Sequence, residues 1–203
     1  MQYILVIVLA YLLGCSNMAT YLAAMKKVDL SAGGSKNPGA SNVVILMGWK
    51  AGVLTAVHDI GKSALAVVLA GLVFPELPYI QAVAGVASVL GHIFPFWMKF
   101  KGGKGFASYL GMTIALNWKF SIVVLLLLVV ITLITDYIVA ATANTIIIVP
   151  IWMGIASHSL ALALILLVAS VVIAWKHREN FVRIYKGTEI RFRKAGRGDY
   201  RVK

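Results

Sequence analysis

A basic, glycine-rich stretch between hydrophobic segments holds the residues best suited to chemistry: Lys101, Gly102, Gly103, Lys104 and Gly105. Glycines let backbone N–H groups approach an anion closely, and lysines add full positive charge. A helix expected to begin at about residue 105 would direct its positive end to the same place. The stretch therefore predicts a phosphate-binding loop, although lysines at a membrane boundary can also simply face lipid headgroups.

The composition places this loop in a membrane protein. The chain has 203 residues, of which 61% are hydrophobic, whereas about half are apolar in a soluble domain. Its mean hydropathy is +0.89. Long uncharged runs suit helices of roughly 20 residues that cross a bilayer, and unbroken apolar runs such as 125–130 contradict the alternation of a β-barrel. We therefore expect an all-α polytopic membrane protein.

The distribution of charge predicts the topology. The net charge is +12, and basic residues gather in the first loop, in 99–104 and from residue 176 onward. Because basic loops stay cytoplasmic, we expect the N-terminus outside and the C-terminus in the cytoplasm. About seven transmembrane helices follow, some short or partial, with five full and two partial spans as the alternative. The expected spans are 3–24, 50–73, 79–97, 105–117, 119–135, 138–156 and 159–175. They form one domain over 1–190, followed by a basic cytoplasmic tail over 191–203.

A second loop, residues 33–42, lies on the same expected side as the basic loop. It is dense in small polar and turn-forming residues. It can be a plain connector, but two glycine-rich loops on one side can also face one ligand.

Ionisable residues inside the spans form two further groups. Asp59 and Lys62 lie three residues apart, share one helix face and are expected to pair as support for the loops. His92 precedes the basic loop and suits a functional or a structural role equally, whereas His58 and His158 suit structural or interfacial places.

At the inner end of the last span, residues 177–180 read His-Arg-Glu-Asn and add an imidazole, a guanidinium and an amide to the same side as the two loops.

Several functional classes are excluded or disfavoured. The single cysteine, Cys15, excludes an intrachain disulfide and a cysteine metal cage, and no metal site is expected. A basic tail beside a hydrophobic body meets anionic lipid more readily than nucleic acid, so we expect no nucleic-acid partner. No His-x-x-x-x-Asp pair is present, and no Ser–His–Asp arrangement is legible in the sequence.

The three cytoplasmic patches, in this order and spacing, resemble the bacterial acyl-phosphate:glycerol-3-phosphate acyltransferases over nearly the whole chain. The family's Gly-Ser-Gly-Asn-x-Gly-x-Thr-Asn loop corresponds to Ser35, Asn37, Pro38, Gly39, Ser41 and Asn42, and its Asp-x-x-Lys pair to Asp59 and Lys62. The second motif corresponds to Gly91, His92, Pro95 and Lys101 to Gly105. The third corresponds to His177, Arg178, Glu179 and Asn180, with Gly187 and Glu189.

The resemblance implies an enzyme that transfers an acyl group from acyl phosphate to the sn-1 hydroxyl of glycerol 3-phosphate. The products would be lysophosphatidic acid, used in phospholipid synthesis, and phosphate. It also implies a multi-pass protein of the bacterial inner (plasma) membrane with its site facing the cytoplasm. No cofactor, coenzyme A or carrier protein is implied. Expected partners are the two substrates, membrane lipid and the phosphotransacylase that forms acyl phosphate.

The resemblance also assigns roles. Catalytic roles are implied for Lys104, His177, Asn180 and Ser35. Substrate contacts are implied for Asn37, Gly39, Ser41, Asn42, Lys101, Gly102, Gly103, Gly105 and Arg178, and we add Lys36 from the departure described below. Supporting roles are implied for Asp59, Lys62, His92 and Thr142. Because an acyl phosphate has a good leaving group, alignment and charge neutralisation carry most of the catalysis, and the resemblance suggests that a substrate phosphate takes the hydroxyl proton.

The chain departs from the family at three places. Ile45 stands where the family has an arginine that contacts phosphate, and Lys36 stands where it has glycine, so Lys36 is expected to replace the arginine in part. Where the family has a serine-rich segment, 136–142, only Thr142 carries an aliphatic hydroxyl. These departures leave open a catalytically impaired homologue that binds lipid or an altered acceptor, and a small transporter is a further alternative.

Overall fold

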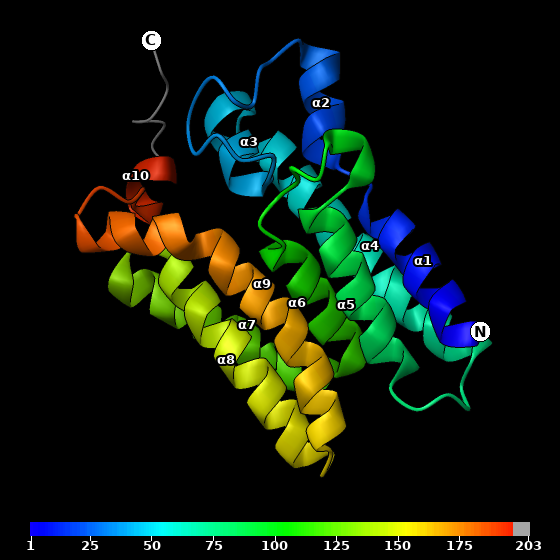
Figure 1. Ribbon diagram of the computed structural model, residues 1–203. Helices are drawn as coiled ribbons and strands as arrows, with labels where there is room; N and C mark the ends of the chain where they lie inside the picture. Colours follow the sequence, from blue (N-terminus) through cyan, green and yellow to red (C-terminus); the bar gives the residue numbers. More distant parts are fainter. Residues whose placement is uncertain (197–203) are drawn as a thin grey trace.

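The computed structural model describes residues 1–196, and residues 197–203 of the predicted tail lie outside this part (Figure 1). Every regular element within residues 1–196 is helical. The helices are α1 (Gln2–Gly14), α2 (Met18–Lys26), α3 (Ala40–Met47), α4 (Trp49–Val73), α5 (Ile80–Ile93), η1 (Phe96–Met98), α6 (Phe106–Leu116), α7 (Trp118–Thr135), α8 (Ile138–Ala156), α9 (Leu160–Tyr185) and α10 (Phe192–Gly196). The all-α prediction is therefore confirmed.

Six segments of the described chain are long and apolar enough to cross a membrane. They are Gln2–Lys26, Trp49–Val73, Ile80–Met98, Trp118–Thr135, Ile138–Ala156 and Leu160–Tyr185. The shorter apolar helix α6, Phe106–Leu116, occupies the place of the expected seventh span. The prediction of about seven helices, some of them partial, matches this set.

Helix α5 is the centre of the bundle, and α1, α4, α6 and α9 all pack on it. Eleven of its fourteen residues are buried. Close approach depends on small residues: a Cβ at Gly14 of α1 would overlap the backbone of Ser88, and one at Gly91 would overlap the backbone of Tyr11. Small residues at such crossings let membrane helices come into van der Waals contact. Because α5 ends at Ile93, it leads directly into the loop that carries the basic residues.

Three local features differ from the expected spans. The first span, 3–24, is broken between α1 and α2, where Asn17 caps α2 by accepting the Thr20 N–H at 2.9 Å. The last three residues of loop 33–42 belong to the first turn of α3, a helix that was not expected. The last span is one helix that continues to Tyr185, so residues 177–180 lie inside α9 rather than after it.

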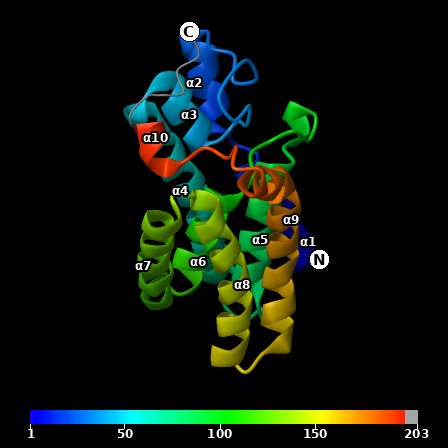
Figure 2. The same cartoon turned by 90° about the vertical axis from the view of Figure 1, so that its left-hand side faces the viewer.

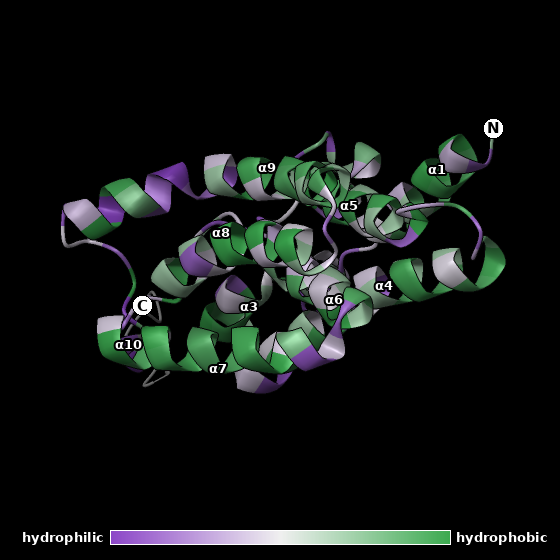
Figure 3. Ribbon diagram, turned by 90° about the horizontal axis from the view of Figure 1, so that it is seen from below, coloured by the Kyte–Doolittle hydropathy of each residue, from purple (hydrophilic) through white to green (hydrophobic). Residues whose placement is uncertain are grey.

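The candidate polar segments gather at one end of the bundle. In both side views α2, α3, α10, the 94–105 loop and the C-terminal part of α9 lie at this end, and the α8–α9 turn lies at the opposite end (Figures 1 and 2). Seen from below, apolar colour dominates the outer helices, as on α7 (Figure 3). On α7 the side chains of Leu126 and Ile134 are 61% and 78% exposed, which suits a surface that faces lipid.

Candidate functional site

The basic loop is built by backbone contacts with the end of α5. The Gly102 N–H donates to the carbonyl of Ile93, and the Gly103 N–H donates to the carbonyl of His92, both at 3.1 Å. A Cβ at Gly103 would overlap the His92 ring, so glycine is required for this close approach. The two N–H groups are thus committed to the protein, and the expectation that they face an anion is wrong; the glycines shape the loop instead.

Gly105 turns the loop into helix α6. Its φ is +87°, a left-handed conformation that glycine adopts without strain, and α6 begins at the next residue. Nearby, the buried hydroxyl of Ser108 has no hydrogen-bond partner among the described residues. The sequence gives no signal for this unpaired group, which lies in the first turn of α6.

Lys104 is brought to α9 by this turn. Its Nζ donates to Oδ1 of Asn180, a residue 76 positions later and only 5% exposed. Asn180 in turn donates from Nδ2 to Glu189 Oε1 at 2.7 Å, and Glu189 Oε2 accepts from Arg183 Nε at 2.7 Å. Lys104, Asn180, Glu189 and Arg183 therefore form one chain of polar contacts, which we call the α9 network.

The surroundings of Lys104 lower the pKa of its ammonium group. Burial, together with the nearby Arg183 guanidinium, lowers the pKa of Lys104 to about 8 from its ordinary value of 10.5, while the Glu189 and Glu179 carboxylates oppose the shift. An ammonium that is half-buried and incompletely neutralised attracts an anion strongly.

His177 lies on the same face of α9 as Asn180, three residues earlier, and is 6% exposed. Its Nδ1 donates to the carbonyl of Ile173 at 2.8 Å. In the neutral ring this contact leaves Nε2 as an acceptor. Ile173 also borders Gly105, so His177 is placed close to the turn that carries Lys104.

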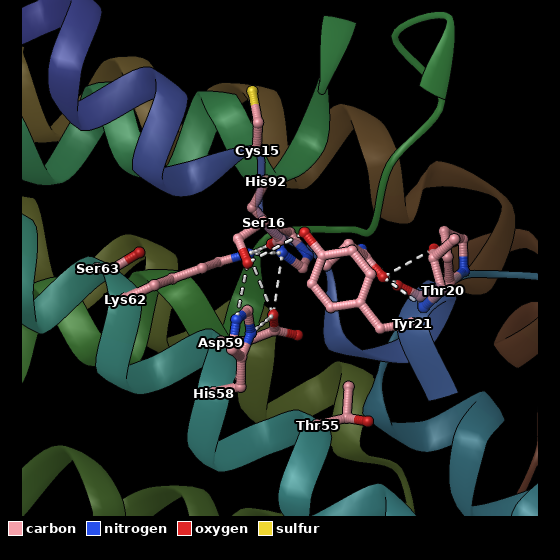
Figure 4. Close-up of polar contacts among 12 residues, drawn as sticks. Cys15, Ser16, Thr20, Tyr21, Thr55, His58, Asp59, Lys62, Ser63 and His92 are labelled. Carbon is pink, nitrogen blue, oxygen red and sulfur yellow. Dashed lines mark hydrogen bonds and ion pairs between the residues drawn. The ribbon is translucent and has the colours of Figure 1, made fainter. Parts of the chain in front are cut away.

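The predicted Asp59–Lys62 pair is confirmed, and it is part of a buried cluster (Figure 4). Lys62 Nζ lies 3.1 Å from Asp59 Oδ1 and 2.8 Å from His92 Nδ1, and it also donates to the carbonyl of Ser16. His92 is 3% exposed, with its ring against Gly103. The cluster therefore connects α4 with the basic loop through His92, consistent with a supporting role.

In loop 33–42, Asn42 is a structural centre. It is fully buried; its Oδ1 accepts the Ser35 N–H at 2.8 Å and its Nδ2 donates to the Leu30 carbonyl at 2.9 Å. The oxygen and the nitrogen of the amide are thus both engaged within the loop, so Asn42 shapes the loop. A substrate that contacts Asn42, as predicted, would have to share these two atoms. Ser35 is held at the surface of the loop, with a half-buried side chain.

The other predicted residues of this loop are accessible. Lys36 and Ser41 are exposed, and Lys36 has a left-handed φ of 55°. Asn37 and Gly39 are half-buried, and the Gly39 N–H donates to the Asn37 carbonyl at 2.9 Å. Ile45, at the place of the family arginine, is 8% exposed.

The remaining predicted residues lie apart from the α9 network. The Arg178 guanidinium stacks over the Trp175 ring, 4.7 Å from its centroid, and its side chain is 54% exposed. Lys101 is exposed. Thr142 is 1% exposed and donates to the Ile138 carbonyl at 3.1 Å, so its hydroxyl is used within α8.

The segment after α9, residues 186–193, returns to the end of α7, and we call it the strap. The Phe192 and Arg193 N–H groups donate to the Asp136 carbonyl and carboxylate, at 2.8 Å and 3.0 Å. Glu189 lies within this strap, so the strap carries one member of the α9 network. Glu189 belongs to the third motif of the sequence but was given no role there, and Arg183 was not singled out, because sequence spacing did not reveal that they meet at Asn180.

A cavity of about 500 Å³ lies at the opposite end of the bundle, lined by residues such as Leu77, Tyr79 and Leu162. It is remote from Lys104 and carries none of the predicted site residues. Within residues 1–196 no three His, Cys, Asp or Glu side chains gather to hold a metal ion.

Comparisons with known proteins agree with this architecture. A family model described as glycerol-3-phosphate acyltransferase matches residues 4–187. Proteins of that name from Synechococcus sp. (strain CC9902) and Coxiella burnetii (strain RSA 331 / Henzerling II) are each 35% identical to this chain. The alignments cover 96% and 93% of this chain and 97% of each relative.

The fold matches crystal structures of PlsY, an integral membrane glycerol 3-phosphate acyltransferase. The glycerol 3-phosphate form gives a TM-score of 0.89 at 32% identity, covering 95% of this chain and 96% of that chain. The lysophosphatidic acid form gives 0.86 at 30% identity, covering 96% and 98%. This chain belongs to the glycerol-3-phosphate acyltransferase family of integral membrane proteins.

Proposed function

We propose that this protein transfers an acyl group from acyl phosphate to the sn-1 hydroxyl of glycerol 3-phosphate, forming lysophosphatidic acid and phosphate. Family membership supports acylation of glycerol 3-phosphate. The observation that carries the proposal is the α9 network, in which a half-buried lysine from a glycine-rich loop meets an asparagine one turn from a buried histidine.

The phosphate of the acyl donor binds at Lys104 and the start of α6. The lysine supplies a full charge in a partly dry site, and the N-terminus of an eleven-residue helix adds its dipole. The unpaired Ser108 hydroxyl is a donor that an anion could satisfy. The leaving phosphate develops charge as the acyl carbon–oxygen bond breaks, so these groups bind the transition state more strongly than the ground state.

The acceptor hydroxyl is oriented by His177 and Asn180. His177 Nε2 is an acceptor, so it can hold the neighbouring 2-hydroxyl of glycerol 3-phosphate and thereby direct the sn-1 oxygen at the acyl carbon. The proton of the sn-1 hydroxyl passes to a substrate phosphate, because the reactive mixed anhydride demands little from a protein base. Ser35, Asn37, Gly39, Ser41 and Lys36 of the neighbouring loop are proposed to bind the glycerol 3-phosphate, and Lys101, Gly102, Gly103 and Gly105 to shape the donor site.

The active site is proposed to face the bacterial cytoplasm from the plasma membrane. The basic loops that favour the cytoplasmic side are those at the α2–α3–α10 end of the bundle (Figures 1 and 2). Water-soluble glycerol 3-phosphate then reaches the site from the cytoplasm, while the acyl chain lies between helices open to lipid. The phosphotransacylase that forms the donor is proposed as a partner on this face.

The test is a direct assay with purified protein in detergent, palmitoyl phosphate and glycerol 3-phosphate. We expect phosphate release that depends on the acceptor, with lysophosphatidic acid detected in equal amount. Release with another acceptor alone would identify an altered substrate. No release with any acceptor would refute the proposal and indicate an inactive homologue.

A further inference from the structure

A second constellation suited to acyl chemistry lies outside the α9 network. Ser16, in the break between α1 and α2, places its Oγ 2.9 Å from Nε2 of His58 on α4. His58 Nδ1 lies 3.3 Å from Oδ1 of Asp59. Although no such arrangement was legible in the sequence, serine, histidine and aspartate are connected in series (Figure 4). A hydroxyl, a base and a group that orients the base are the components of an activated serine nucleophile.

Hydrogen-bond directions in this series fit that role. Asp59 is paired with the Lys62 ammonium, so its carboxylate is ionised and can only accept. His58 must therefore donate from Nδ1, which leaves Nε2 as an acceptor facing Ser16. The Tyr21 hydroxyl donates to Ser16 Oγ at 3.3 Å, and this directs the serine's own proton toward His58.

Exposed apolar side chains lie on the same face of α4 as His58. Ser16 is half-buried, and the side chain of His58 is 21% exposed. Leu54 and Leu65 share the His58 face of α4 by helical spacing and are 47% and 48% exposed. A fatty acyl chain that packs along this face of α4 would therefore lie beside His58 and outside the α9 network.

The surroundings also supply stabilising positive potential. Helix α2 begins at Met18, so its positive end lies at Ser16. Lys62 donates to the Ser16 carbonyl and fixes the backbone there, while its charge is balanced by Asp59. The start of α2 would favour the negative oxygen that forms when a carbonyl is attacked.

We propose that Ser16, His58 and Asp59 form a second acyl-transfer site that slowly hydrolyses membrane-borne esters or mixed anhydrides of fatty acids. Ser16 Oγ attacks the acyl carbon and passes its proton to His58, which returns it to the leaving group as the carbon–oxygen bond breaks. Water then attacks the Ser16 ester; His58 takes one water proton and delivers it to Ser16 Oγ. The sum is one acyl compound and one water giving a fatty acid and the protonated leaving group.

A long-chain alkyl fluorophosphonate tests the proposal without depending on glycerol 3-phosphate transfer. The full-length protein in detergent should form a covalent adduct that mass spectrometry of peptides locates on Ser16. His58→Gln should slow labelling about 100-fold, because a general base contributes at least this factor. Ser157→Ala, at a hydroxyl engaged within its own helix, is the matched control and should label as the original protein does.

The outcomes are decisive in both directions. No adduct, or an adduct only at Cys15 or Tyr21, overturns the proposal, and so does unchanged labelling in His58→Gln. These results do not depend on the stability of a serine variant, because the adduct is mapped in the original protein. Lys104→Ala should label normally even though the proposed transfer to glycerol 3-phosphate is lost, so failure of one activity is separable from failure of the other.

Discussion

Asn180 donates its Nδ2 to Glu189 Oε1 across 2.7 Å, and this contact fixes which way its amide points. Because the carboxylate can only accept, Nδ2 must face it and Oδ1 must face Lys104. A residue in the strap after α9 thus determines how a residue within α9 meets the basic loop. The orientation of the proposed active site therefore depends on a segment outside the predicted spans.

Removal of this carboxylate should impair activity and stability together. Glu189→Ala leaves Asn180 free to turn and Arg183 without its buried partner. A lost charge-assisted hydrogen bond costs about 1.5–3 kcal/mol, so we expect a roughly ten- to hundredfold lower kcat and a lower Tm. Glu189→Gln keeps an acceptor for Asn180, so its kcat and Tm should lie between those of Glu189→Ala and those of the original protein. If Glu189→Ala keeps full kcat, Asn180 does not depend on this contact.

Removal of the proposed phosphate-binding charge should lower turnover without unfolding the protein. Lys104→Ala is expected to lower kcat at least about a hundredfold, since its charge stabilises the departing phosphate in a partly dry site. Lys104 is only half-buried, so we expect the variant to stay monodisperse and folded. Lys186→Ala, at an exposed position after α9, is the control for a lost positive charge. Activity of Lys104→Ala within a few-fold of the original would exclude the role.

The pH dependence of kcat/KM follows from the depressed pKa of Lys104. The group is charged below about pH 8 and neutral above it, and phosphate binding requires the charged form. We therefore expect activity to decline about tenfold per pH unit above this value, well below the 10.5 of an ordinary lysine. Initial rates in non-nucleophilic buffers from pH 6 to pH 10 measure this alkaline limb.

Two neighbours of Lys104 should move the limb in opposite directions. Glu189 raises the pKa of Lys104 and Arg183 lowers it. Glu189→Gln should therefore shift the decline to lower pH, and Arg183→Met should shift it to higher pH. A limb that stays in place in both variants would show that some other group titrates.

The proposed orientation can be tested by labelling engineered cysteines with a membrane-impermeant maleimide. Cys15 is 3% exposed, and Cys15→Ala provides the background. Cysteines at Lys36, Lys99 and Lys186 should react only after the cytoplasmic side is opened, and one at Glu76 should react from outside. Reaction of the Lys186 position in intact cells would reverse the topology and the access route of glycerol 3-phosphate.

Features that depend on residues close together in the sequence, or on composition, could be predicted. The Asp59–Lys62 pair follows from a spacing of three residues, which places both side chains on one helix face. The glycines of the basic loop are explained by its close packing, because a Cβ at these positions would overlap neighbouring atoms. The membrane class follows from composition alone. These features need no knowledge of how distant segments meet.

Contacts between distant segments could not be predicted in this way. Lys104 meets Asn180 across 76 positions, and Ser16 meets His58 across 42, so neither pair has a local signature. The break between α1 and α2 was hidden because both halves are apolar, although Asn17 is a favourable helix cap. The loop N–H groups were expected to be free, but tertiary packing on α5 engages them.

Ile45 replaces the arginine that would bind the acceptor phosphate. Ile45 is buried and uncharged, whereas Lys36 in the same loop is exposed, so Lys36 is the available cation for the acceptor phosphate. An ammonium is a poorer partner than a guanidinium, which binds two oxygens at once. We therefore expect a high KM for glycerol 3-phosphate in the original protein, which Ile45→Arg should lower.

Loss of the Lys36 charge should raise this KM further while leaving kcat at saturating acceptor nearly unchanged. Lys36→Asn is the suitable variant, because asparagine tolerates the left-handed φ of 55° at this position. The expected increase is roughly ten- to hundredfold, from about 1.5–3 kcal/mol for a charge-assisted contact. Lys27→Asn is the matched control, since Lys27 is also exposed and left-handed, with a φ of 53°. Equal KM values in the two asparagine variants would show that Lys36 is a surface charge, and no gain from Ile45→Arg would point to a different acceptor.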